Sequence, residues 1–155
     1  MHQSHRPQVS IDHAHRVLVG ICIALAGSVF VMASVSLVLV SSGTFPPFLG
    51  FSPTVRIGVG VFLVLLLGAS YPIYRHAGEG VQGDGPDDAM AAFQTKVIAA
   101  MAVREFVGIA GGLLILLSRD MVLGGTLVVL SIGTILLALP RKDDLRAALS
   151  ERAGP

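Results

Sequence analysis

The sequence has no tryptophan, one cysteine and few charged residues. Asp, Glu, Lys and Arg make up 14% of its 155 residues, hydrophobic residues make up 53%, and the mean hydropathy is +0.76. This balance lies outside the usual range of soluble domains. The lone Cys22 excludes an internal disulfide. A net charge of +1 gives no overall field that would attract nucleic acid, so we expect no nucleic-acid partner.

The residue groups that most enzyme sites need are also scarce. No nucleophile stands with a base and an acid in a recognisable pattern, and one cysteine cannot supply a thiol pair. The apolar runs contain no histidine, which excludes a haem held by histidines within them. The histidines near the N-terminus have no cysteine or carboxylate cluster to complete a metal site; they are His2, His5, His13 and His15. We therefore expect no enzymatic activity, no cofactor and no metal site.

What the sequence has instead is a set of four long apolar runs. A helix needs about 20 apolar residues to cross the ~30 Å hydrocarbon core of a bilayer. The expected spans cover approximately residues 17–40, 55–74, 93–118 and 121–139. The first run is too long for a secretory signal, whose apolar core has about 7–15 residues. The sequence therefore predicts an all-α polytopic membrane protein, an antiparallel four-helix transmembrane bundle within residues 17–140.

Polar segments flank this predicted bundle. Residues 1–16 form a histidine-rich arm, which we expect to be disordered or to lie at the membrane surface. Pro140 stops the fourth run. In the tail, residues 141–155, the apolar residues Leu145 and Leu149 stand at helical spacing and predict a short amphipathic helix. Such a short helix is not stable without a membrane or another segment to pack against.

The lysine and arginine residues are unevenly divided between the two sides of the predicted bundle. One side would hold Arg6, Arg16, Arg75, Lys96, Arg141, Lys142, Arg146 and Arg152, and the other Arg56 and Arg119. Positively charged flanking segments stay on the cytoplasmic side of a membrane. The distribution predicts an inner-membrane protein with both termini and the linker at residues 77–88 in the cytoplasm.

The third run differs from the others because it carries two charges, Arg104 and Glu105, in its middle. A charge at bilayer depth costs about 2.5–3.5 kcal/mol on insertion scales, so it marks a site or a structural contact. Glu105 lies eight residues after Val97, or roughly 12 Å along a helix, which is close to the midplane. Arg104 is long enough to extend toward the nearer membrane surface. Neighbouring helix residues point about 100° apart, so each charge needs its own partner.

Glu105 shares one helix face with Gly108 and Gly112, at i+3 and i+7. Small residues at such spacing let a second helix approach closely, so we expect the carboxyl to face a tight helix contact and to be buried. Its polar partner is expected on another span or in a second subunit; the internal candidates are Ser28, Ser34, Thr126, Ser131 and Thr134. Three roles remain open for Glu105: a hydrogen bond that holds helices in register, a proton- or ion-handling carboxylate, and a subunit contact.

The last third of the chain carries a pattern of its own. An aromatic-Gln pair is followed by an alanine, a glutamate and several glycines, and the last apolar run ends at a proline before a leucine-bearing tail. The residues are Phe93, Gln94, Ala102, Glu105, Gly108, Gly111, Gly112, Pro140, Leu145 and Leu149. In this pattern the chain resembles small four-span bacterial membrane proteins of unknown function. That resemblance implies the four-span fold and no particular activity.

The spacing of Glu105, Gly108 and Gly111 is also similar to the ion-binding helix of the rotor-ring proteolipids of ATP synthases. Two features depart from that family. Arg104 stands beside the carboxylate, where a fixed cation would compete with a transported ion, and the first span has no GxGxG run.

Two hypotheses for the function follow. The first is a non-enzymatic integral inner-membrane protein, a packing or accessory component that is embedded in the lipid bilayer and associates with itself or with another membrane protein. The alternative is a small proton- or ion-coupled transport component that uses the intramembrane carboxyl of Glu105. Replacing Glu105 with Gln separates them, because an amide keeps the hydrogen bond but carries no exchangeable acidic proton.

Overall fold

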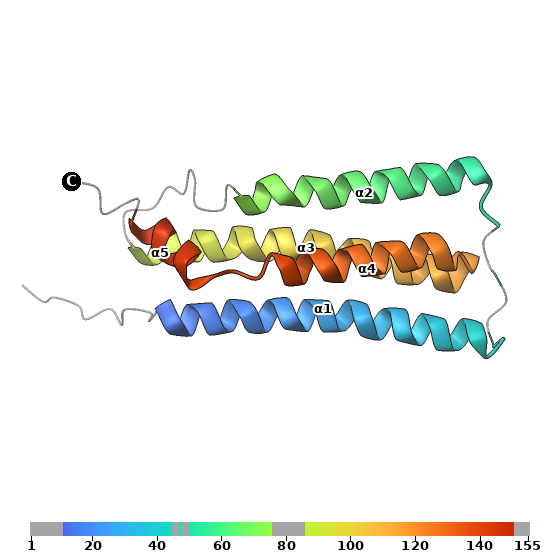
Figure 1. Ribbon diagram of the computed structural model, residues 1–155, viewed down its shortest axis with the longest axis horizontal. Coiled ribbons are helices and arrows are strands. Elements are labelled where there is room, and N and C mark those ends of the chain that lie inside the picture. Colours follow the sequence, from blue (N-terminus) through green and yellow to red (C-terminus); the bar gives the residue numbers. More distant parts are fainter. Residues whose placement is uncertain (1–10, 45–46, 48–49, 76–85, 151–155) are drawn as a thin grey trace, which may run out of the picture.

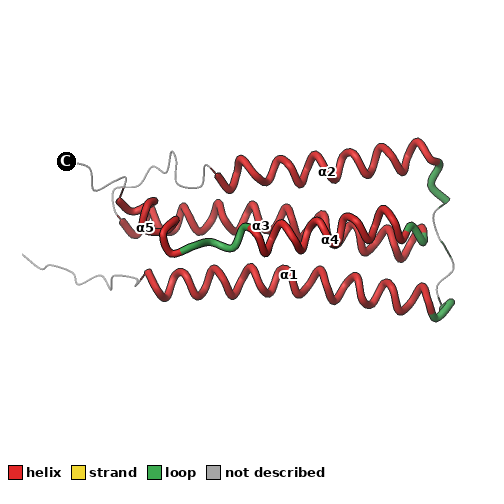
Figure 2. Tube along the Cα trace, in the orientation of Figure 1, coloured by secondary structure: helices red, strands yellow, loops and turns green. Residues whose placement is uncertain are grey.

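The structure is a computed structural model that describes residues 11–44, 47, 50–75 and 86–150. These residues form helices α1 (Ile11–Ser41), α2 (Pro53–Arg75), α3 (Pro86–Ser118), α4 (Met121–Leu137) and α5 (Lys142–Ser150), and none of them lies in a strand. Helices α1 to α4 lie side by side and alternate in direction along the chain (Figures 1 and 2). The all-α prediction is confirmed for this part of the chain.

Three of the helices are long and apolar enough to cross a membrane. They are α1, α2 and the part of α3 from Met90 to Ser118. Helix α4 is equally apolar in character but has 17 residues. Each of the four predicted apolar runs therefore falls on one helix, and α4 lies at the short end of the range for a span.

Helix α3 is the centre of the arrangement, because it contacts α1, α2, α4 and α5. Helices α1 and α2 lie on opposite sides of the α3/α4 pair, and their backbones do not come into contact in the described residues (Figure 1). The backbone of α2 therefore contacts the rest of the bundle through α3 and α4.

The α3–α4 turn consists of Arg119 and Asp120 only. Arg119 adopts a left-handed conformation with φ 55°, which ends α3 at Ser118 and reverses the chain. Asp120 is the N-cap of α4, where its carboxylate accepts a hydrogen bond from the backbone N–H of Leu123 at 3.1 Å. Such a cap satisfies one of the free N–H groups at a helix start.

The helix ends differ from the sequence-based boundaries. Helix α1 begins at Ile11, so residues 11–16, which were expected to belong to the N-terminal arm, are helical. The reason is packing, since Ala14 is 2% exposed and lies in the same apolar cluster as α3 and α5 residues. Helix α3 begins at Pro86 and α4 ends at Leu137, before the predicted limit of residue 139. The predicted features within residues 1–10, 76–85 and 151–155 lie outside the described residues.

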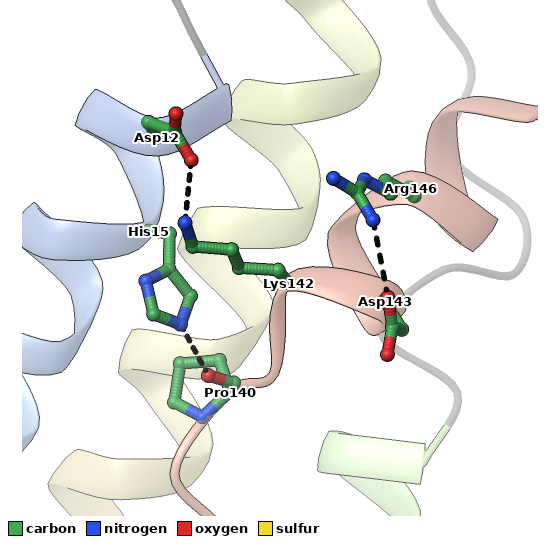
Figure 3. Close-up of polar contacts among 6 residues, drawn as sticks. All are labelled: Asp12, His15, Pro140, Lys142, Asp143 and Arg146. Carbon is green, nitrogen blue, oxygen red and sulfur yellow. Dashed lines mark hydrogen bonds and ion pairs between the residues drawn. The ribbon is translucent and has the colours of Figure 1, made fainter.

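Helix α5 covers the end of the bundle where α4 stops early. Its Leu145 is fully buried in a cluster with Leu18 of α1 and Phe93 of α3. Lys142 forms an ion pair of 2.7 Å with Asp12, and Nε2 of His15 hydrogen-bonds the carbonyl oxygen of Pro140 at 3.1 Å (Figure 3). The predicted tail helix is therefore present, and the segment it packs against is its own bundle.

Candidate functional site: buried Arg104 and the outer carboxyl of Glu105

The side chain of Arg104 lies inside the bundle between α2, α3 and α4. Arg104 is 3% exposed. Its Nε donates a hydrogen bond to Oγ of Ser70 on α2, and one Nη donates to the carbonyl oxygen of Thr134 on α4, both at 3.0 Å. The guanidinium also lies over the ring of Tyr74, 5.5 Å from its centroid. The side chain of Arg104 thus links α3 to both α2 and α4.

These contacts replace the expected extension of Arg104 toward the membrane surface. Among the described residues no carboxylate forms an ion pair with Arg104; the ion pairs recorded there join other residues. The positive charge is stabilised by two neutral oxygen acceptors, by the sulfur of Met101 at 3.7 Å and by the π-face of Tyr74. This arrangement suits a structural contact between helices.

A third interhelical hydrogen bond joins α4 to the backbone of Arg104. Ser131 of α4 is fully buried and donates to the backbone carbonyl of Arg104 at 2.6 Å. Ser131 and Thr134 were both candidates for partners of Glu105, but the structure places both against Arg104. The backbone of α3 at this level is therefore bonded to α4.

Glu105 points in another direction, toward the outer side of α1. Its carboxylate accepts a hydrogen bond from the hydroxyl of Ser28, which is one of the five candidates named from the sequence. Ser28 is exposed and Glu105 is partly exposed, so the pair lies at the edge between α1 and α3. We expected a buried Glu105. The difference arises because Arg104 takes the inward direction, and the next residue is turned about 100° away from it.

The glycines on the same face as Glu105 mark close helix contacts. A Cβ added at Gly108 would lie 2.5 Å from Oγ of Ser131 and 2.5 Å from a methyl of Val29. A Cβ at Gly112 would lie 3.1 Å from the side chain of Met32. Both glycines therefore sit where α3 packs tightly on α1, and Gly108 also touches α4.

A close contact between the backbones of α3 and α4 was not predicted from the sequence. At Gly111 an added Cβ would lie 2.8 Å from the carbonyl oxygen of Gly124, and at Gly124 it would lie 2.5 Å from that of Gly111. The two glycines let the backbones of α3 and α4 touch. Glycines occur in both apolar runs, but only the three-dimensional register shows that these two face each other.

An ion pair joins the N-terminal end of α2 to the α3–α4 turn. Nε of Arg56 forms an ion pair of 3.2 Å with a carboxylate oxygen of Asp120 in the α3–α4 turn. The sequence pattern indicated Arg56 only as a charge flanking the membrane. With Ser70 bonded to Arg104 at the other end, α2 is fastened at two separate levels.

The described residues contain no group of three His, Cys, Asp or Glu side chains that could hold a metal ion. The fold and the site define an all-helical protein with membrane-length apolar helices held together by a buried arginine and close glycine contacts. Comparison with known protein families, with curated proteins and with solved structures finds no match to this chain.

Proposed function

We propose that the protein is an integral inner-membrane protein in which α1 to α4 all cross the bilayer, with both termini in the cytoplasm. Its outer surface supports this. Large apolar side chains point away from the bundle on several helices, with Phe30 65%, Leu65 67% and Val122 80% exposed. Soluble monomers rarely expose large continuous apolar surfaces, whereas lipid tails solvate them.

Helix α4 is the shortest of the proposed spans. Its 17 residues give a length of about 26 Å at ~1.5 Å per residue, against a hydrocarbon core of about 30 Å. The apolar residues Ala138 and Leu139 extend the run beyond the helix end. Bilayers thin locally by a few ångströms to match a short span at modest cost.

Within this membrane setting, we propose a non-enzymatic packing or accessory role. The observation that carries the proposal is the set of bonds made by Arg104. This buried cation is bonded to Ser70 of α2 and to Thr134 of α4. A charged group engaged in this way fixes the relative positions of helices, and polar groups within membranes commonly act so.

The alternative role, proton or ion handling, is supported by one observation on Glu105. Its carboxyl is partly exposed at the α1/α3 edge and is bonded to a hydroxyl, so it is reachable from outside the bundle. This is the one acidic side chain between Val97 and Ser118, the apolar part of α3.

Two experiments test these proposals. Alkaline carbonate washing of membranes should leave the protein in the pellet, and its release would overturn the membrane assignment. The purified chain should then be reconstituted in liposomes that enclose a pH-sensitive dye. The accessory role predicts the same proton leak as empty liposomes. A larger flux that Glu105→Gln abolishes would overturn it in favour of the alternative.

A further inference from the structure

Helices α1 and α4 present apolar surfaces of different length to the outside of the bundle. On α1 the large exposed apolar residues run from Val17 to Val38, and on α4 they run from Met121 to Leu137. At ~1.5 Å per residue these surfaces are about 32 Å and about 24 Å long. The hydrocarbon core of a bilayer is ~30 Å thick. In a protein that spans the bilayer, as proposed above, the two helices therefore require hydrocarbon of different thickness.

The contacts of Gly108 on α3 provide a common depth from which both surfaces can be measured. A Cβ added at Gly108 would lie 2.5 Å from a methyl of Val29 on α1 and 2.5 Å from Oγ of Ser131 on α4. Val29 and Ser131 therefore lie at the same depth in the bundle. Because α1 and α4 run in opposite directions, the start of α1 and the end of α4 lie together at the end that carries α5 (Figure 1).

Measured from this depth, the two surfaces differ at one end of the bundle. Toward the α3–α4 turn, the α1 surface continues for nine residues to Val38 and the α4 surface for ten to Met121, or about 14 Å and about 15 Å. Toward α5, the α1 surface continues for twelve residues to Val17 but the α4 surface for only six to Leu137, or about 18 Å and about 9 Å. The α4 surface is therefore short at the α5 end.

The chain beyond Leu137 does not extend the lipid-facing surface. Residues 138–141 are not helical, and Ala138 and Leu139 pack against the buried cluster of the bundle. Irregular backbone does not occur exposed to hydrocarbon. The next side chains, Arg141 and Lys142, are charged and exposed. The hydrocarbon beside α4 therefore has to end close to Leu137.

We propose that the bilayer leaflet at the α5 end is locally thinned beside α4, and that the outer face of α4 binds phospholipids with shorter chains than the face of α1 does. A bilayer adapts to a short span by thinning, at a cost that grows with the mismatch. Lipids whose chains already match the span avoid this cost, so they collect beside α4.

The side chains on the outer face of α4 fit lipid chains as the occupant. Apart from Thr126, the exposed residues of this fully described helix are Met, Val and Leu. The hydroxyl of Thr126 donates a hydrogen bond to the carbonyl oxygen of Val122 in its own helix, at 2.7 Å. The face therefore leaves no side-chain donor that needs a partner outside the chain.

A thinned leaflet also lowers the cost of burying Arg104. The guanidinium donates to the carbonyl oxygen of Thr134, which lies three residues before Leu137. This spacing corresponds to about 4.5 Å along the helix. The charge then lies within one helical turn of the locally lowered membrane surface, where an arginine is tolerated better than at the bilayer centre.

The first test compares the water accessibility of two positions at the same depth. In a Cys22→Ala background, Leu137→Cys lies six residues from Ser131 and Ile23→Cys lies six residues from Val29, both at exposed positions toward α5. A membrane-impermeant maleimide is added to membrane vesicles of each orientation. Because a thiol reacts as the thiolate, which needs water, Leu137→Cys should be labelled from the α5 side and Ile23→Cys should not. Both should react fully after denaturation.

The second test measures which lipids touch each face. The sequence has no tryptophan, so an introduced one is the sole indole. Val129→Trp on α4 and Val31→Trp on α1 are matched, because each lies two residues from the common depth toward the turn and replaces a residue that is more than half exposed.

The variants are reconstituted in mixtures of fourteen-carbon and eighteen-carbon phosphatidylcholine, with bromine on the chains of one lipid and then of the other. Bromine quenches an indole that it touches, so the quenching reports the lipid composition at each tryptophan. We expect the shorter lipid to be enriched at Val129→Trp by at least about twofold over Val31→Trp.

The outcomes separate local thinning from the membrane assignment on which it rests. Release of the protein by carbonate would remove both. If the protein stays in the membrane, protection of Leu137→Cys or equal labelling of the two thiols overturns the thinning alone. Selective labelling of Leu137→Cys with the same lipid composition at both tryptophans also overturns it, in favour of a water-filled recess.

Discussion

The guanidinium of Arg104 and the carboxyl of Glu105 are adjacent in the chain, yet they bond to different helices. Arg104 reaches Ser70 and the carbonyl of Thr134, whereas Glu105 reaches Ser28. A direct pair between them would have neutralised both charges within α3. Their separation instead gives α3 a polar attachment on each side, which suits a central helix.

The bond between Arg104 and Ser70 can be measured by a double-mutant cycle. We expect Arg104→Met and Ser70→Ala to be coupled by about 0.6–1.7 kcal/mol in the free energy of unfolding in detergent. A single replacement of Arg104 also changes the desolvation cost of burying its charge. The cycle cancels this cost and isolates the coupling between the two side chains. Ser118→Ala is the control, because that hydroxyl donates to Leu114 of its own helix. Coupling no larger than with Ser118 would show that the bond adds nothing.

Gly108 offers a second test at the level of one residue. Gly108→Ala should lower the free energy of unfolding by about 1–3 kcal/mol, because its methyl group would overlap Ser131 and Val29. Gly125→Ala on α4 is the matched control, since its Cβ would meet nothing within 4 Å. There the gain in helix propensity should leave the stability equal or slightly higher. Equal effects at the two positions would contradict the close contact.

At the level of helices, apolar length predicted which segments are helical but not where they end. The backbone of α1 continues to Ile11 because Ala14 is buried beneath α5, and hydropathy does not report burial by a later segment. The same limit applies to Gly111 and Gly124. Each is visible in the sequence, but their contact depends on the register between α3 and α4, which no local pattern specifies.

Helix α5 shows how a short helix is stabilised by tertiary packing. Leu145→Ala should loosen α5, because it removes the side chain that α1 and α3 enclose. We expect amide hydrogen exchange in α5 to become at least about tenfold faster, which corresponds to a loss of ~1.4 kcal/mol. Arg146→Ala is the control, because this exposed residue forms an ion pair only with Asp143 in the described contacts (Figure 3). Similar exchange in both variants would mean that Leu145 does not hold the helix.

At the scale of the whole molecule, the two attachments of α2 compensate for its lack of backbone contact with α1. Helix α2 is bonded to the α3–α4 turn through Arg56 and Asp120, and to α3 through Ser70 and Arg104. These two contacts lie near opposite ends of α2 and restrict its movement relative to α3 and α4. These few polar contacts hold α2 in the bundle together with apolar packing. Leu63 of α2, for example, lies in a buried cluster with Val107 of α3 and Leu127 of α4.

The alternating directions of α1 to α4 place Gly43 and the C-terminal end of α2, at Arg75, on opposite sides of the proposed membrane, since α2 lies between them. Of the Lys and Arg residues that flank the helices, the side of Gly43 holds only Arg56 and Arg119, which is fewer than the opposite side holds. The positive-inside rule then assigns the side of Gly43 to the periplasm. A topology reporter inserted at Gly43 should therefore indicate a periplasmic location, and one inserted after Gly83 should indicate a cytoplasmic location. The reverse pattern would overturn the orientation, and equal signals would mean that α2 does not cross the membrane.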